Sequence, residues 1–127
     1  MYCSVSDVVR TQPLLTAAPE QIDFEAAIAE ASQIAASDLD SVLDVAVIDF
    51  EVNSGGKPPA KLRQLTRYKA REIAYSVYYG GKASDTSEIS LNRDMYNELL
   101  EQIRDDRENG LLDDRLIRLS TVGSFFC

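Results

Sequence analysis

The sequence has no histidine among its 127 residues. Histidine is the commonest general base in enzymes, because its side chain changes charge near neutral pH. No spacing in the sequence marks out a pair of acids that could replace it. We therefore expect a protein that is not an enzyme and that has no catalytic residue. The alternative, an enzyme that uses carboxylates such as a small hydrolase, would need two acids that converge in a pocket.

Cysteine is almost as scarce, since only Cys3 and Cys127 are present, close to the two ends of the sequence. A zinc site or a disulfide framework needs more ligands at closer spacing, so we expect two unpaired thiols and no bound metal. The double glycines at 55–56 and 80–81 lack the other residues of a nucleotide-binding fingerprint. We therefore expect no cofactor.

Long apolar runs are missing too, because no stretch approaches the roughly 20 residues that a bilayer crossing needs. The first residues, Met1 to Ser4, lack the charged and apolar regions of a signal peptide. We expect no membrane partner and a cytosolic origin. The composition, 45% apolar and 27% charged, suits one compact folded domain.

Basic residues are absent between Thr11 and Gly56, a segment that contains nine acids. The next segment, Lys57 to Lys82, contains seven bases and one acid. This charge pattern predicts that the two segments lie against each other, within one subunit or between neighbours. The net charge of −8 argues against a general nucleic-acid-binding protein, which would usually be basic.

Apolar residues recur every three or four positions over most of the chain, which predicts a mainly α-helical fold. A short helix is expected over residues 5–11. Ser4 and Asp7 resemble a capping box at its start, and Pro13 is expected to stop it.

A long second helix is expected to begin after an N-cap at Asp23 and to continue to about residue 46. Its apolar pattern blurs after Asp44, where Val45–Ile48 could instead form a strand. Residues 53–59 are expected to form a loop, because glycine and proline are concentrated there.

Two further helices complete a small bundle of about four. Pro59 suits the first turn of the third helix, and the glycines at 80–81 are expected to end it. A polar loop is expected over residues 81–90. Asn92 can then cap a fourth helix, which is expected to end at residues 109–110.

Residues 111–127 have no clear helical period, yet they are more apolar than a typical disordered tail. We interpret residues 1–110 as one helical domain and 111–127 as an extended C-terminal arm that docks on a partner. The alternative is that these residues fold back over their own subunit. The arm residues assigned to docking are Leu116, Ile117, Leu119, Val122, Phe125 and Phe126.

The third helix has an apolar stripe, a tyrosine stripe roughly opposite it, and three arginines spaced four apart. A helix that is apolar on two sides packs against two neighbours, and one of these can be another subunit. The tyrosines are therefore assigned to a subunit interface or, alternatively, to a cap over the core. The arginines are expected to pair with the acidic second helix, with phosphate contact as the alternative. The six residues of this interface assignment are Tyr68, Tyr75, Tyr79, Arg63, Arg67 and Arg71.

Asp38 and Lys69 each fall near the apolar stripe of their predicted helices. Burial of an isolated charge is costly. We therefore expect each of the two to pair with a partner or to extend to the rim of the core.

The order of these elements carries a family resemblance. A short helix follows Met1-Tyr2, and an alanine-rich helix comes next. A Pro58-Pro59 loop then leads into a helix that reads LRQLTRYKAREIAY over 62–75, before a shorter helix and an extended tail. This order resembles the head–tail connector family of tailed phages, also called adaptor or head-completion proteins. The resemblance covers about residues 1–110, and the loop at 53–59 and the tail from Leu111 onward are harder to match to the family.

The resemblance implies a virion structural protein. Family members form a ring, commonly of twelve copies, below the portal at the capsid vertex. The ring extends the DNA channel and offers a platform to the next neck or tail-completion protein. In several members the C-terminal arm reaches the portal. The implied partners are further copies, the portal and the next neck protein, and the ring encloses double-stranded DNA without reading its sequence. The implied location is the neck of the virion, after synthesis in the host cytoplasm.

A DNA channel has reason to be acidic, because repulsion keeps the phosphates from binding to its wall. Glu30, Asp40 and Asp44 are assigned to such a wall, with an ordinary solvated surface as the alternative. A second class of function stays open. It is a small helical regulator that binds one partner, without enzymatic activity, as a monomer or dimer.

Overall fold

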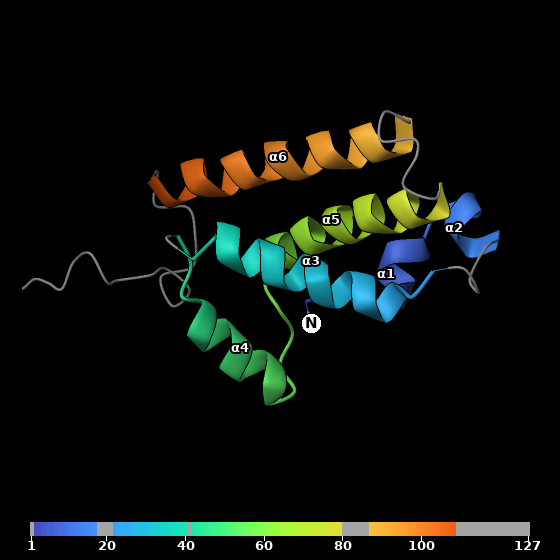
Figure 1. Cartoon of the computed structure of the whole chain (residues 1–127). Coiled ribbons are helices and arrows are strands. Elements are labelled where there is room, and N and C mark those ends of the chain that lie inside the picture. Colours follow the sequence, from blue (N-terminus) through green and yellow to red (C-terminus); the bar gives the residue numbers. More distant parts are fainter. Residues whose placement is uncertain (1, 18–21, 41, 80–86, 109–127) are drawn as a thin grey trace, which may run out of the picture.

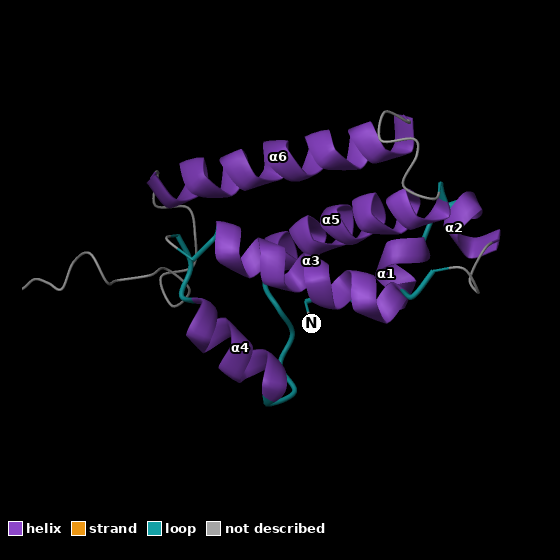
Figure 2. Ribbon diagram, viewed as in Figure 1, coloured by secondary structure: helices purple, strands orange, loops and turns teal. Residues whose placement is uncertain are grey.

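The computed structural model describes residues 2–17, 22–40, 42–79 and 87–108. Within these residues the chain forms α-helices joined by loops (Figures 1 and 2), so the predicted mainly α-helical fold is confirmed. None of the described helices has the length and apolar character needed to cross a membrane. The helices are α1 Val5–Val9, α2 Pro13–Ala17, α3 Phe24–Asp38, α4 Val45–Asn53, α5 Ala60–Tyr78 and α6 Ser87–Glu108.

Helix α5 lies at the centre of the bundle, between α3 and α6 (Figure 1). The short helices α1 and α2 also pack against it. The prediction that this helix needs two neighbours is therefore confirmed. Both neighbours, however, belong to the same chain, so the two apolar sides of α5 do not require a second subunit.

Two clusters of buried apolar side chains fill the bundle, one toward each end of α5. The first cluster consists of Tyr2, Ala35, Leu39, Val42, Leu43, Ile48, Leu62, Leu65, Tyr68, Tyr96, Leu99, Leu100 and Ile103. The second consists of Val8, Leu15, Ile22, Phe24, Ile28, Ala31, Ala70, Ala74, Tyr75 and Ile89.

The acidic and basic segments lie against each other, as their charges predict, because α3 packs along α5. Within the described residues, however, no ion pair joins these two helices. Their contact is apolar and includes small side chains that let the helices approach closely. Four alanines with no exposed surface contribute to it, namely Ala31, Ala35, Ala70 and Ala74. The arrangement was predicted correctly, but burial and not charge pairing explains it.

Two predicted helix starts are confirmed by their caps. The side chain of Ser4 accepts a hydrogen bond from the Asp7 amide, and the Asp7 carboxylate accepts one from the Ser4 amide. Asp23 accepts a hydrogen bond from the amide of Ala26 at the start of α3. Each cap satisfies amide groups that have no partner within the helix.

The predicted long second helix is wrong, because the chain turns after Asp38 and starts again as α4. The turn buries Leu39, Val42 and Leu43 in the first cluster, at 0%, 5% and 4% exposure. A continuous helix would also place these three side chains on one face, so their apolar spacing does not reveal the turn. Asp44 then caps α4, so the alternative strand at 45–48 is wrong as well.

The predicted start of the fourth helix is also wrong, because α6 begins at Ser87 and Asn92 lies inside it. The Asn92 side chain is buried and donates a hydrogen bond to the carbonyl oxygen of Glu88, at 2.8 Å. An asparagine can therefore satisfy its amide within a helix as well as at its start. Pro13 does not stop α1, which already ends at Val9; it is the first residue of α2, a helix that was not predicted.

Candidate interaction surfaces

Arg71 fixes the N-terminal segment to the centre of the bundle. Its side chain is buried, and its guanidinium donates hydrogen bonds to the carbonyl oxygens of Asp7, Val8 and Arg10, at 3.1, 2.8 and 2.8 Å. These carbonyls belong to the end of α1, where no further helical amide is present to bind them. Burial lowers the pKa of Arg71, but an arginine stays charged near neutral pH. Its positive charge also suits the negative end of a helix.

Asp7 makes a second connection between α1 and α5. Its carboxylate, 5% exposed, accepts hydrogen bonds from Nε and Nη2 of Arg63, at 2.9 and 2.6 Å. The Arg63 hydrogen bonds hold the pKa of this carboxyl well below its usual range, although burial acts in the opposite direction. Arg63 was expected to pair with the acidic second helix. That expectation is wrong, because the acid that reaches it comes from α1.

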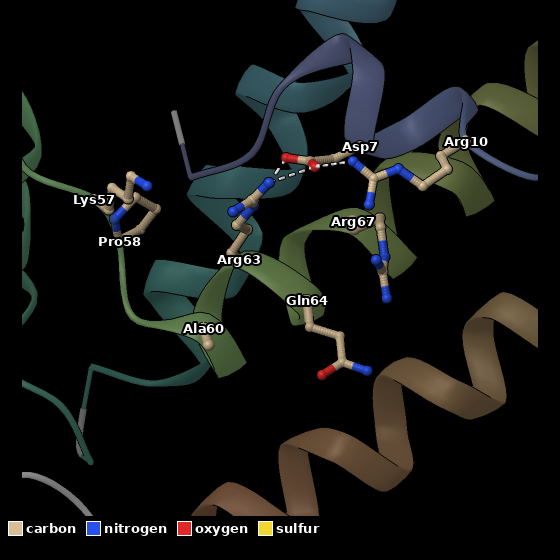
Figure 3. Close-up of a pocket in the computed structure, with 8 residues that line it drawn as sticks. All are labelled: Asp7, Arg10, Lys57, Pro58, Ala60, Arg63, Gln64 and Arg67. Carbon is tan, nitrogen blue, oxygen red and sulfur yellow. Dashed lines mark hydrogen bonds and ion pairs between the residues drawn. The ribbon is translucent and has the colours of Figure 1, made fainter.

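A basic pocket of about 490 Å³ opens beside this ion pair (Figure 3). Figure 3 shows Lys57 and Arg63 on one side of Asp7 and Arg10 on the other. The pocket lies between α1 and the first turns of α5. Its lining carries four cationic side chains and one carboxylate, in a chain whose net charge is −8. The residues that line the basic pocket are Asp7, Arg10, Lys57, Pro58, Ala60, Arg63, Gln64 and Arg67.

Three of the four cations in the basic pocket keep charge that Asp7 does not neutralise. Arg10 is 64% exposed, and its guanidinium lies 4.0 Å from the Asp7 carboxylate, a distance too long for a hydrogen bond. Lys57 is exposed and forms no ion pair within the described residues. The Nε atom of Arg67 is buried without a hydrogen-bond partner. The pocket can therefore bind a further anionic group.

The predicted tyrosine stripe is divided by the structure. Tyr68, 8% exposed, lies in the first cluster, and Tyr75, 2% exposed, lies in the second. Tyr79 stacks against Tyr75 and donates a hydrogen bond to Glu88, at 2.8 Å. Because Tyr68 and Tyr75 are buried in their own chain, they have almost no surface for a neighbouring subunit. The alternative reading, in which the tyrosines cap the core, therefore fits Tyr68 and Tyr75 better than the interface reading. For Tyr79 the interface assignment stays a prediction.

Asp38 and Lys69 both meet Tyr96 of α6, so the expectation that they are paired is confirmed. The Tyr96 hydroxyl donates a hydrogen bond to Asp38 at 2.5 Å, and the ammonium of Lys69 lies 4.4 Å from the centre of the ring. Lys69 also pairs with Glu72, at 2.9 Å. Burial and the hydrogen bond to Asp38 raise the pKa of Tyr96, which keeps its hydroxyl as the donor. This network joins α3, α5 and α6.

The three acids assigned to a channel wall do not share one helix. Glu30 is exposed on α3, and Asp40 is exposed in the turn that follows. Asp44 caps α4 by accepting a hydrogen bond from the Val47 amide, at 3.3 Å. Their place in a channel wall stays a prediction. The arm residues Leu116, Ile117, Leu119, Val122, Phe125 and Phe126 lie outside the described residues.

Helix α4 has an exposed apolar face that was not predicted from the sequence. It extends away from the other helices (Figure 1), and Ile48 is its only buried residue. Val52 packs partly against the first cluster, whereas Val47 and Phe50 are 36% and 73% exposed. The available signal was the spacing, because Ile48 and Val52 are four apart on one face and Val47 and Phe50 three apart on another.

An acidic row along α6 was also missed. Its five carboxylates follow one another at intervals of four, three, four and three residues, which places them on one face of the helix. All five side chains are exposed, and none forms an ion pair within the part of the chain that the structure describes. The acidic row consists of Asp94, Glu98, Glu101, Asp105 and Glu108.

The described residues contain no group of three or more histidine, cysteine, aspartate or glutamate side chains that could hold a metal ion. Cys3 is a free, half-buried thiol, and Cys127 lies outside the described residues.

Comparison of the chain with protein-family models, with curated proteins and with solved structures found no match.

Proposed function

We propose that the chain is a virion structural protein, a head–tail connector subunit that forms a ring below the portal of a tailed phage. The ring extends the DNA channel and joins the capsid vertex to the next neck or tail-completion protein. It encloses double-stranded DNA without reading its sequence. The resemblance of the short first helix, the alanine-rich helix α3 and the Pro58-Pro59 segment before α5 supports this proposal. Helices α2 and α4 and the length of α6, 22 residues against 19 in α5, lie outside that resemblance. By the same resemblance the ring has about twelve copies and belongs to the virion neck.

The observation that carries the proposal is the exposed apolar face of α4. The bundle covers both apolar sides of its central helix within one chain, yet it leaves Phe50 73% exposed on a helix that extends from it. Covering a phenylalanine side chain contributes roughly 2 kcal/mol, so a partner that contacts this face is favoured. Ring subunits need such surfaces in addition to their own cores.

The charged surfaces give a second line of support. Each chain has a basic pocket and an acidic row on different helices. Surfaces of opposite sign on one subunit suit head-to-tail contacts, which are the contacts that generate rings. A regulator that binds one partner needs only one such surface.

The test is assembly with the portal protein from the same genome. Size-exclusion chromatography with light scattering would be run on the chain alone and mixed with portal, followed by electron microscopy of the complex. We expect a ring of several copies on the portal, even where the chain alone is a monomer. A complex of one or two copies that ignores the portal would instead favour the regulator.

The exposed face of α4 is tested by Phe50→Ser. This change should weaken assembly while leaving the circular dichroism spectrum unchanged, because the side chain lies outside both core clusters. Val77→Ser is the matched control, since Val77 is 49% exposed on α5 and away from α4. Equal effects of the two substitutions would show that α4 has no special part in assembly.

A further inference from the structure

The basic pocket holds more positive charge than the described residues of its own chain neutralise. Asp7 accepts two hydrogen bonds from Arg63, whereas the guanidinium of Arg10 lies 4.0 Å from its carboxylate. Lys57 and Arg67 have no carboxylate partner within the described residues. The amide of Gln64 adds a neutral polar group to the same wall. These groups suit several carboxylates presented together.

The acidic row on α6 has the opposite excess. Carboxylates three and four residues apart on one helix face repel one another and weaken the helix. A basic surface laid against the row would remove this repulsion. Within the described part of the chain the row has no such surface, as its five side chains form no ion pair.

The row and the pocket of one subunit cannot meet. Helix α6 turns its apolar face, with Ile89, Tyr96 and Ile103, toward its own core. The exposed acidic row therefore faces away from α5, whereas the basic pocket lies between α5 and α1. Only a second chain can bring an acidic row to the pocket.

We infer that the basic pocket is the docking site for the acidic row of a second copy of this chain. Lys57 and Arg67 meet carboxylates at the middle of the row, near Glu98 and Glu101. Because each copy presents both surfaces, the contact repeats from copy to copy in one direction and closes into a ring. The inference rests on the proposed function and names the contact that would build its ring.

The test exchanges charges across the proposed contact. A pocket variant carries Lys57→Glu and Arg67→Glu, a row variant carries Glu98→Lys and Glu101→Lys, and a combined variant carries all four changes. Self-association of the full chain is measured by sedimentation equilibrium at low and high salt. Ring formation on the portal is measured in parallel.

We expect the pocket variant and the row variant each to weaken association by at least about ten-fold, because like charges then face each other. The combined variant restores opposite charges and should return to within about three-fold of the original chain. Rising salt should weaken association of the original chain.

Net charge alone makes a different prediction. Each double reversal changes the charge by four units, so the pocket variant carries −12, the row variant −4 and the combined variant −8. If general repulsion controlled association, the row variant would associate more tightly than the original chain. Weaker association of that variant is therefore specific to the contact. The single variant Glu101→Lys is compared with a matched control, Glu25→Lys, which makes the same change of charge at an exposed position of α3.

The outcomes separate this inference from the proposed function. A ring on the portal that is indifferent to the reversals overturns the inference and leaves the function standing. Charge-dependent self-association without portal binding supports the contact between copies and overturns the proposed function. The absence of both self-association and portal binding overturns both. If the pocket variant assembles normally but retains less duplex DNA on a filter, the pocket is a phosphate contact and the inference fails. Circular dichroism checks folding, and Lys57→Gln with Arg67→Gln repeats the test where the reversal unfolds the chain.

Discussion

The guanidinium of Arg63 donates two hydrogen bonds to the carboxylate of Asp7, 56 residues earlier in the chain. Asp7 caps α1 through Ser4, and the end of α1 is bound by Arg71. Two arginines of α5 thus hold the two ends of one short helix. A five-residue helix is not stable alone, so these contacts maintain it. The same helix forms one wall of the basic pocket.

Asp7→Asn should lower the free energy of unfolding by about 2 kcal/mol at pH 7, because a buried charge-assisted hydrogen bond is lost. The folded-state pKa of Asp7 lies below its value in the unfolded chain. Its contribution is therefore present above about pH 4 and is lost as the pH falls. Urea unfolding at several pH values should show that the original chain loses more stability on acidification than the variant. Parallel pH profiles of the two would contradict this.

Arg71→Lys should destabilise the chain by about 1–3 kcal/mol, because lysine cannot bind three carbonyls with a planar fork. The loss should be concentrated in α1, whose last carbonyls would lack partners. Hydrogen exchange should therefore show reduced protection of the Val8 and Arg10 amides, with α6 little changed. Arg104→Lys, at an exposed position of α6, is the matched control. Uniform loss of protection would contradict a local role for Arg71.

Burial, with a smaller contribution from Asp7, raises the pKa of the Cys3 thiol to about 11. At pH 8 roughly one Cys3 in a thousand is then a reactive thiolate. In a Cys127→Ser background, iodoacetamide should alkylate Cys3 far more slowly than it alkylates an exposed cysteine with an ordinary pKa. The rate of alkylation of Cys3 should rise up to about pH 11. Adding Asp7→Asn should speed the reaction at pH 8. A rate profile centred near pH 8.5 would show that Cys3 is not shielded.

The helical nature of the chain could be predicted from sequence because apolar spacing reports directly on helices. The turn between α3 and α4 could not. Leu39, Val42 and Leu43 fit the spacing of a continuous helix, and they are buried in the turn for the same reason that they would be buried in a helix. Pattern alone cannot distinguish these two ways of burying them.

The arginine face shows a second limit. Arg63, Arg67 and Arg71 are spaced four apart, and each step of four rotates a residue by about 40° around an α-helix. Arg71 is therefore turned about 80° from Arg63 and reaches the core, at 7% exposure, while the Arg63 side chain is 47% exposed. Their partners on α1 depend on how that helix crosses α5, which no local spacing reveals.

Deletion of residues 116–127 should abolish attachment to the portal while leaving the helical bundle folded. Among the described residues, the two core clusters are formed by side chains between Tyr2 and Ile103, all of which the deletion leaves in place. Circular dichroism at 222 nm and the melting temperature should change little, and co-sedimentation with portal should be lost. Phe125→Ser with Phe126→Ser is the finer version of the same test, since it keeps the length of the arm. Unfolding on deletion would instead place these residues against their own subunit, and undisturbed portal binding would remove the arm from the interface.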